Sequence, residues 1–207
     1  MSESPLDTSR EFITARLDPI EDWRETALPP DTEPAAVLVP LVERPEGMGV
    51  ILTLRPETLR RHAGQIAFPG GRADPGERPW ETALREAHEE IGLDPSRVTV
   101  AGLVEPFRVG GWFCATPVIG FVPPDFVPEA NPEEVADVFE TPFEFLMNAA
   151  NHREHIITGL DGVTYRTLAM PWGDRFIWGA TAGMLHSLYR RLYGQHEEPW
   201  ALRSGPA

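Results

Sequence analysis

The chain has 207 residues, of which 42% are hydrophobic and 24% are charged, so its length and composition suit one globular domain with a full core. Its formal net charge of −14 argues against sequence-independent nucleic-acid binding, because an acidic surface repels phosphate backbones. No apolar run approaches the roughly 20 residues of a membrane-spanning helix, and the polar N-terminus lacks signal-peptide features. The single cysteine, Cys114, cannot form an internal disulfide. From these features together we expect a cytoplasmic protein without membrane or nucleic-acid partners.

The elements that the sequence predicts are strands with helices dispersed among them. Residues 1–34 are polar and proline-containing, so we expect an N-terminal extension with a short helix at about residues 9–23. In chain order, we then expect strands at residues 35–42, 49–55 and 66–68, a helix at 79–91, strands at 98–104 and 117–122, a helix at 142–150, a strand at 163–169 and a closing helix at 178–193. This order predicts an α/β layered sandwich with a mixed sheet over residues 35–194, followed by a tail at 195–207.

The helix expected at residues 79–91 carries crowded acids. At about 3.6 residues per turn, Glu86 and Glu90 stack on one face, and Glu89 lies about one step further round. A different, apolar stripe is expected to face the core and consists of Trp80, Leu84, Ala87 and Ile91. Like charges at this spacing destabilise a helix by roughly 0.2–0.5 kcal/mol per pair, and the helix dipole also disfavours acids near the C-terminus.

A divalent cation would resolve this conflict between the acids. Mg²⁺ takes hard oxygen ligands, completed by water and phosphate. Violations of local rules are also expected at functional sites. The alternative is a solvated acidic face, since glutamate is a good helix former, and the helix alone does not decide between the two interpretations.

The residues around this helix resemble the Nudix box, a pattern of fixed spacing that here spans residues 71–93. Its specified positions are all filled, by Gly71, Glu77, Arg85, Glu86, Ala87, Glu89, Glu90, Gly92 and Leu93. The resemblance implies a Nudix α/β/α sandwich with a central mixed sheet, in which the box forms a loop–helix–loop. It also implies a hydrolase that uses Mg²⁺ or Mn²⁺ to cut a diphosphate bridge.

The resemblance also implies roles for single residues. In the family, the glutamates that match Glu86 and Glu90 bind the metal, often with Glu89 and the carbonyl oxygen that matches Gly71. Arg85 is expected to pair with Glu77 and so to orient the catalytic loop and helix. Water attacks phosphorus, and a carboxylate acts as general base. The candidates for this base are Glu86, Glu89, Glu133, Glu134 and Glu140, of which Glu134 is preferred, with a solvated surface role as its alternative.

The stretch before the box resembles a further signature, that of the coenzyme A diphosphatase branch of the family. The matching residues are Ile51, Leu52, Thr53, Arg55, Arg60, Gly64, Phe68, Pro69, Gly70 and Gly71. Pro56 departs from the signature, because a serine is usual there. Residues 176–183 resemble the same branch. The resemblance implies hydrolysis of coenzyme A or its derivatives to 3′,5′-ADP and (acyl-)4′-phosphopantetheine.

A basic group in this stretch agrees with a substrate that carries several phosphates. Coenzyme A has a diphosphate and a 3′-phosphate, and the planar fork of arginine suits phosphate recognition. The residues expected to bind substrate are Arg55, Arg60, Arg61, His62 and Phe68. The alternative for the cations is a structural role, in which they hold the loop to neighbouring acids.

Other functions remain open at this point. One is a Nudix hydrolase for ADP-ribose, NADH or a dinucleoside polyphosphate, against which the upstream signature argues. Isopentenyl diphosphate isomerisation would need a catalytic cysteine, and Cys114 lacks the expected surroundings. A non-catalytic Nudix ligand-binding module often loses box carboxylates, whereas this chain keeps them. We expect a monomer or homodimer that acts on a small molecule.

Overall fold

The computed structural model describes residues 6–24, 28–29, 31–58, 62–110, 112–158, 162 and 164–194. Within these residues a central sheet is formed by β1 (Glu33–Arg44), β2 (Gly47–Leu54), β3 (Ile66–Ala67), β4 (Gly70–Arg72), β5 (Thr99–Leu103), β6 (Phe107–Val109), β7 (Phe113–Val122) and β8 (Asp137–Pro142). A smaller sheet is formed by β9 (Arg153–Thr158), β10 (Thr164–Trp172) and β11 (Arg175–Trp178). The helical elements are α1 (Arg10–Thr14), η1 (Ile20–Asp22), α2 (Pro79–Ile91), η3 (Pro95–Arg97), α3 (Phe143–Leu146), η4 (Ala149–Asn151) and α4 (Gly179–Tyr193).

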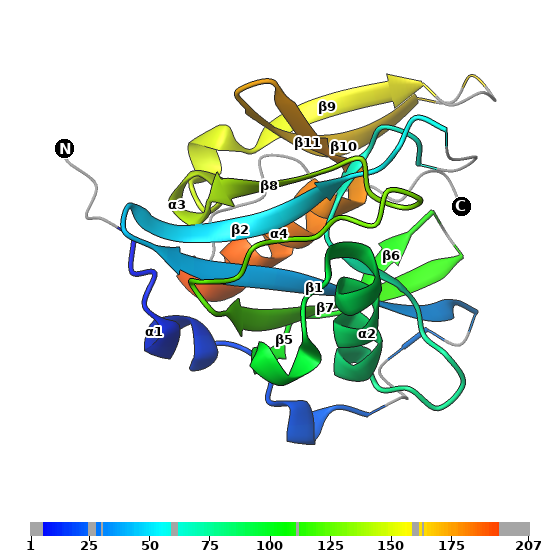
Figure 1. Cartoon of the computed structure of the whole chain (residues 1–207). Helices are drawn as coiled ribbons and strands as arrows, with labels where there is room; N and C mark the ends of the chain where they lie inside the picture. The colour runs from blue at the N-terminus through cyan, green and yellow to red at the C-terminus, as the bar shows by residue number, and fades with distance from the viewer. Residues whose placement is uncertain are drawn as a thin grey trace.

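The central sheet is mixed, as the sequence predicts. Its strands run in the order β3-β2-β1-β7-β5, while β4 pairs with β1, β6 with β7 and β8 with β2. Strands β1 and β7 are parallel along residues 33–42 and 113–122, and their other partners in this sheet are antiparallel. Helix α2 packs on one face of the sheet and α4 on the other (Figure 1), which confirms the predicted α/β/α sandwich.

Alternation along the strands divides the core into two layers. In β1, Ala36 and Leu38 point to the layer under α2, whereas Val39 and Leu41 point to the layer under α4. All four side chains are at most 2% exposed. A strand that is buried on both faces reads as a continuous apolar run, and this explains why the sequence predicts β1 so clearly.

Helix α2 has the predicted bounds, and its core-facing stripe contains Ala87 and Ile91 as predicted, whereas Trp80 and Leu84 lie only at its edge. Pro79 suits the first turn, and Gly92 ends the helix in a left-handed conformation with φ of 70°. Ala83, Ala87 and Ile91 are fully buried against the sheet. The expected core residues Trp80 and Leu84 are only partly buried at the edge of this layer, because small alanines let the helix approach the sheet closely along another row.

The helix expected at residues 9–23 is wrong in its length. Helix α1 begins after Ser9, whose hydroxyl accepts a hydrogen bond from the Phe12 N–H, and it ends at Thr14. Asp18 then exchanges backbone hydrogen bonds of 3.0 and 2.9 Å with Leu103 of β5. Pro19 disfavours the helical conformation at the residue before it, so this segment crosses the sheet edge as extended chain.

The remaining differences between the predicted and the observed elements concern one helix and the edge strands. The helix expected at residues 142–150 is interrupted, because Asn148 caps a separate turn by accepting from the Ala150 N–H at 3.0 Å. Strands β4, β6, β8, β9 and β11 lack the continuous apolar runs of the central strands, so the sequence does not predict them. In the described part of the chain, no helix is long and apolar enough to cross a bilayer.

Candidate active site

Strand β1 changes partner midway along one edge, and the candidate site lies at this change. Residues 35–37 pair with β4 and residues 41–44 pair with β2, while the Leu38 N–H between them donates to the Pro69 carbonyl oxygen at 2.8 Å. Pro69 and Gly70 therefore carry the chain from β3 across to β4. A Cβ atom at Gly70 would lie 2.5 Å from the Ala36 carbonyl oxygen, so the crossing requires a glycine.

Gly71 brings the backbone of β4 against the acidic face of α2. A Cβ atom at this position would lie 2.4 Å from Oε1 of Glu86. The Glu86 carboxylate therefore rests directly on the glycine backbone. This contact brings together Gly71 and Glu86, both of which the sequence predicts as metal ligands.

Arg85 joins the loop before α2 to the helix. Its Nε and Nη2 atoms donate to the two carboxylate oxygens of Glu77 at 2.9 and 3.0 Å, which confirms the predicted pairing. Glu77 also accepts from the Thr82 hydroxyl at 2.8 Å and from the Asp74 N–H at 2.9 Å. The hydrogen bonds from Arg85, above all, lower the pKa of Glu77 to about 2. The Arg85 Nη2 atom also donates to the Arg72 carbonyl oxygen at 3.0 Å.

The same arginine holds two carboxylates in the second half of the helix. Its Nη1 atom donates to Glu86 at 2.8 Å and to Glu89 at 3.2 Å. The Glu86 side chain is 15% exposed, and that of Glu89 is 51% exposed. Burial raises the pKa of Glu86, the charges of Glu89 and Glu134 act in the same direction, and Arg85 opposes them. The like charges are therefore as crowded as the helical spacing predicts.

Glu90 is the most buried carboxylate of the group, with 3% of its side chain exposed. Arg55, just beyond β2, brings its Nη1 atom only to 3.8 Å from Oε1, which is too long for a hydrogen bond. The Oε2 atom is buried and has no hydrogen-bond partner among the described residues. Burial raises the pKa of Glu90 to about 8, with the charges of Glu86 and Glu134 adding to the rise, while Arg55 and the Gly70 backbone oppose it.

The loop of residues 129–136 carries Glu134 to the end of α2. The Asn131 N–H donates to the Glu90 carbonyl oxygen at 2.9 Å, and the Ala136 N–H donates to the Leu54 carbonyl oxygen at 2.8 Å. The loop therefore ties the last turn of α2 to the end of β2. Glu140, another candidate for the general base, lies on β8, and its carboxylate forms an ion pair with Arg44.

The predicted substrate-binding residues have different positions. Arg55 lies beside Glu90, while Arg60 and Arg61 fall outside the described residues. His62 is exposed, with φ of 57°, and its Nδ1 atom lies 2.8 Å from Oε1 of Gln65. Phe68 is 3% exposed and packs in the core layer under α4. The ring therefore fills the core, and a contact between Phe68 and substrate stays a prediction.

The carboxylates fit an open site for a hard divalent cation. In the parts of the chain that the structure describes, no group of three or more His, Cys, Asp or Glu side chains is placed so that it could hold a metal ion by itself. Mg²⁺ does not need one, because it usually binds through one or two carboxylates and keeps waters or phosphate oxygens as its other ligands. The carboxylate oxygens of Glu86 and Glu90 suit this mode of binding, because Oε2 of Glu90 has no hydrogen-bond partner among the described residues. The backbone at Gly71 suits it too, since no side chain separates it from Glu86.

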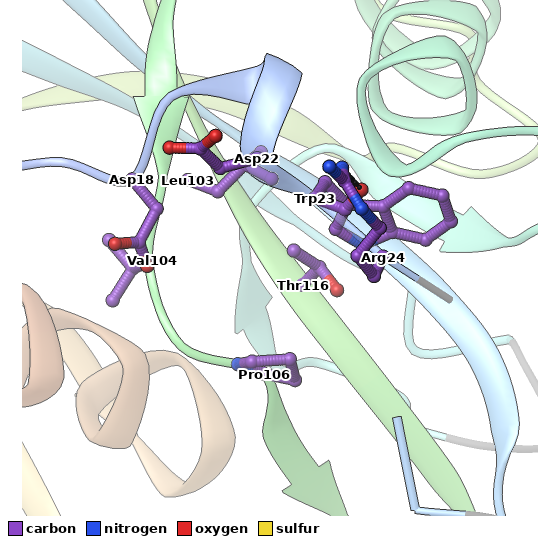
Figure 2. A pocket seen from close by; sticks show the side chains of 8 residues that line it. All are labelled: Asp18, Asp22, Trp23, Arg24, Leu103, Val104, Pro106 and Thr116. Atoms are coloured by element: carbon purple, nitrogen blue, oxygen red, sulfur yellow. Dashed lines mark hydrogen bonds between the residues drawn. The ribbon is translucent and has the colours of Figure 1, made fainter. Parts of the chain in front are cut away.

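A cavity of about 370 Å³ lies elsewhere, between the N-terminal segment and strands β5 and β7. Figure 2 shows its lining residues, which are Asp18, Asp22, Trp23, Arg24, Leu103, Val104, Pro106 and Thr116. Trp23 also meets Trp80 of α2 edge-on, with ring centroids 6.0 Å apart. None of the predicted site residues lines this cavity, so the carboxylate site is separate from it.

Comparisons with known proteins agree with the geometry of the box. Residues 32–158 match the NUDIX domain family. The chain is 42% identical over 160 residues to the uncharacterized Nudix hydrolase NudL of Yersinia enterocolitica, covering 76% of this chain and 80% of that protein. It is 37% identical to the NudL protein of Photorhabdus laumondii, covering 76% of this chain and 84% of that protein.

A solved structure supports the fold in addition. The MutT/nudix family protein from Enterococcus faecalis superposes with a TM-score of 0.53 at 16% identity, covering 90% of this chain and 70% of that one. The chain therefore belongs to the Nudix family, and it is a hydrolase that acts on phosphorus anhydrides.

Proposed function

We propose that this Nudix hydrolase cleaves the diphosphate bridge of coenzyme A or an acyl derivative to give 3′,5′-ADP and (acyl-)4′-phosphopantetheine. The observation that carries the proposal is the position of Arg55, which begins the basic stretch and lies 3.8 Å from Glu90. A substrate with a phosphate beyond its diphosphate needs cations beside the catalytic carboxylates. A basic segment that starts at the buried glutamate meets this need in a chain with a net charge of −14.

The base of the basic loop supports the same proposal. The Arg55 N–H donates to the Gln65 carbonyl oxygen at 3.0 Å, and the Gly64 N–H donates to the Arg55 carbonyl oxygen at 3.2 Å. These bonds hold both ends of the loop next to α2. We therefore propose Arg60, Arg61 and His62 as further phosphate ligands, with the 3′-phosphate as the group that distinguishes coenzyme A from its competitors.

We further propose that Glu86 and Glu90, with Glu89 and the Gly71 carbonyl oxygen, hold the divalent ion that Nudix hydrolases generally need, here Mg²⁺ or Mn²⁺. A bound ion would neutralise charge on the phosphate oxygens and help to ionise the attacking water. The chain itself supplies alignment, because Arg85 fixes Glu86 and Glu89 relative to the loop that Glu77 anchors. Burial of Glu90 adds a strong preference for a cation at its carboxylate.

Glu134 is our proposal for the general base that takes the proton from water. It lies on the loop that is bonded to the last turn of α2, and its charge raises the pKa of both Glu86 and Glu90. The neighbouring Glu133 provides a matched control. Exchange of Glu134 for glutamine should lower kcat by about 10²- to 10⁴-fold, the usual contribution of acid–base catalysis. Equal effects of Glu134→Gln and Glu133→Gln would contradict the assignment.

A substrate panel tests the proposed specificity. The purified protein is assayed with Mg²⁺ or Mn²⁺ against coenzyme A, dephospho-coenzyme A, ADP-ribose, NADH and a diadenosine polyphosphate. We expect coenzyme A to give the highest kcat/KM, and we expect Arg60→Gln or Arg61→Gln to remove its advantage over dephospho-coenzyme A, which lacks the 3′-phosphate. If coenzyme A is inert while another anhydride is cleaved, the enzyme class stands and the coenzyme A proposal fails.

A further inference from the structure

The pair formed by Arg55 and Glu90 is incomplete on both sides. The Nη1 to Oε1 distance of 3.8 Å is that of an ion pair without a hydrogen bond. Within the described residues, neither the Arg55 Nε atom nor the Glu90 Oε2 atom has a hydrogen-bond partner, and both atoms are buried. A buried donor or acceptor without a partner is unfavourable, so each residue gains free energy when a better partner arrives.

The two unsatisfied atoms need different partners. Oε2 of Glu90 accepts from a donor or binds a cation, whereas the Arg55 Nε–H can only donate to an acceptor such as a phosphate oxygen. A divalent cation and a diphosphate together supply both partners. A ligand that brings both a cation and phosphate oxygens would therefore satisfy both buried atoms at once.

The backbone around Arg55 allows its side chain to move by itself. The backbone N–H of Arg55 donates a hydrogen bond to the Gln65 carbonyl oxygen at 3.0 Å, and its carbonyl oxygen accepts one from the Gly64 N–H at 3.2 Å. These bonds hold the end of β2 in place. The Arg55 side chain is 27% exposed, compared with 3% for Glu90, which means that the arginine has a path toward solvent and the glutamate does not. An exchange of partners at this pair must therefore proceed by movement of the arginine.

We propose that Arg55 is an exchangeable counter-ion, which covers Glu90 in the empty enzyme and moves onto a substrate phosphate when Glu90 takes a divalent cation. This inference rests on the proposed function of Glu90 as a metal ligand, but not on the choice of coenzyme A. Loading of the metal then releases the arginine, and binding of the diphosphate holds the arginine away from Glu90. Arg55 in this way couples occupation of the metal site to recognition of the anhydride.

The side-chain Nε–H signals of the arginines in ¹⁵N-labelled protein report this exchange directly. The Arg55 signal is assigned by its loss in Arg55→Lys, and the Arg85 signal is the internal control, because its Nε atom is bonded to Glu77 at 2.9 Å. We expect Mg²⁺ alone to shift the Arg55 signal and speed its exchange with water. Imidodiphosphate is an anhydride analogue that resists hydrolysis. When it is added after Mg²⁺, it should slow the exchange of the Arg55 Nε–H with water again. The Arg85 signal should stay constant throughout.

Glu90→Gln supplies an independent measurement. In this variant the Arg55 signal should already exchange quickly in EDTA and should no longer respond to Mg²⁺. An Arg55 signal that stays unchanged when Mg²⁺ binds would overturn the proposal, and so would a signal that imidodiphosphate does not protect. In kinetics, Arg55→Lys should raise KM for the anhydride substrate roughly tenfold or more with a smaller effect on kcat, since it loses a charge-assisted hydrogen bond to phosphate. Failure of coenzyme A as a substrate would leave these results unaffected, so the two proposals fail separately.

Discussion

Glu77 and Glu90 lie at opposite ends of the same motif, and each has an arginine beside it, yet their environments are opposite. Glu77 receives two hydrogen bonds from Arg85 at 2.9 and 3.0 Å, and its pKa falls to about 2. Glu90 has Arg55 only at 3.8 Å, is almost fully buried, and its pKa rises to about 8. The first carboxylate is satisfied by the fold, whereas the second is not.

We interpret this difference as a division of the motif into a structural part, around Glu77, and a proposed metal-binding part, around Glu90. A carboxylate with several hydrogen bonds stabilises the chain that folds around it. A buried carboxylate without a complete set of partners lowers stability, and such a position is retained where it serves a function. An acid alone in a sequence motif does not reveal which of the two it is, because the partners come from other elements.

The strongest test of this contrast is Glu90→Gln. Activity should fall on the order of 10²-fold or more, because loss of even a supporting residue of a metal site costs about 10- to 100-fold. The melting temperature in EDTA should stay the same or rise, because glutamine has nearly the same shape and is always neutral, whereas the glutamate must be protonated or buried as a charge when the chain folds. A variant that remains active, or that melts clearly earlier in EDTA, would show that Glu90 is instead a structural acid.

Glu77→Gln should have the opposite effect on stability. It removes charge-assisted hydrogen bonds to a partly buried arginine, so we expect a loss of roughly 2–3 kcal/mol in the free energy of unfolding, measured by urea denaturation in EDTA. Glu33→Gln is the matched control, since Glu33 is 61% exposed and lies 3.4 Å from Arg72. Its effect should be about 0.5 kcal/mol or less. Equal losses in the two variants would remove the distinction.

The dependence of stability on pH separates the two acids further, because they act in different pH ranges. Between the usual value of 4.5 and about 8, folded Glu90 keeps a proton that the unfolded chain releases, so stability of the metal-free protein falls as pH rises. The contribution of Glu77 is present above pH 4.5 and is lost as pH falls toward about 2. Melting temperatures in EDTA from pH 5 to 8 therefore report on Glu90 and not on Glu77.

The difference between wild type and Glu90→Gln is the quantity to plot in this experiment. It cancels other groups that titrate in the same range, such as His152, whose pKa is lowered by burial. The wild type should lose stability relative to the variant as pH rises, and Mg²⁺ should reduce this loss. Parallel curves for the two proteins would contradict the raised pKa of Glu90.

The sequence predicts those features of the structure that are set by residues close together in the chain, and it does not predict those that depend on distant segments. The bounds of α2 follow from Pro79 and Gly92, which act within one turn of the chain, and the prediction is confirmed. The pairing of Arg85 with Glu77 was expected from the Nudix resemblance, and it too lies within one loop and helix. The approach of Arg55 to Glu90 and the burial of Phe68 depend on the change of partner along β1, which no local pattern encodes. Tertiary packing decides such positions.

The closed base of the segment between Arg55 and Gln65 has a consequence for evolution and engineering. Since the paired backbone groups at its two ends fix where it leaves and rejoins the sheet, its interior can change length and charge without moving Gly70 or α2. Under our proposal that this segment recognises the substituents of the anhydride, recognition and cleavage of the bridge depend on separable pieces of chain. A segment from another Nudix hydrolase, grafted between the same two residues, should bring its own substrate preference to an unchanged set of carboxylates.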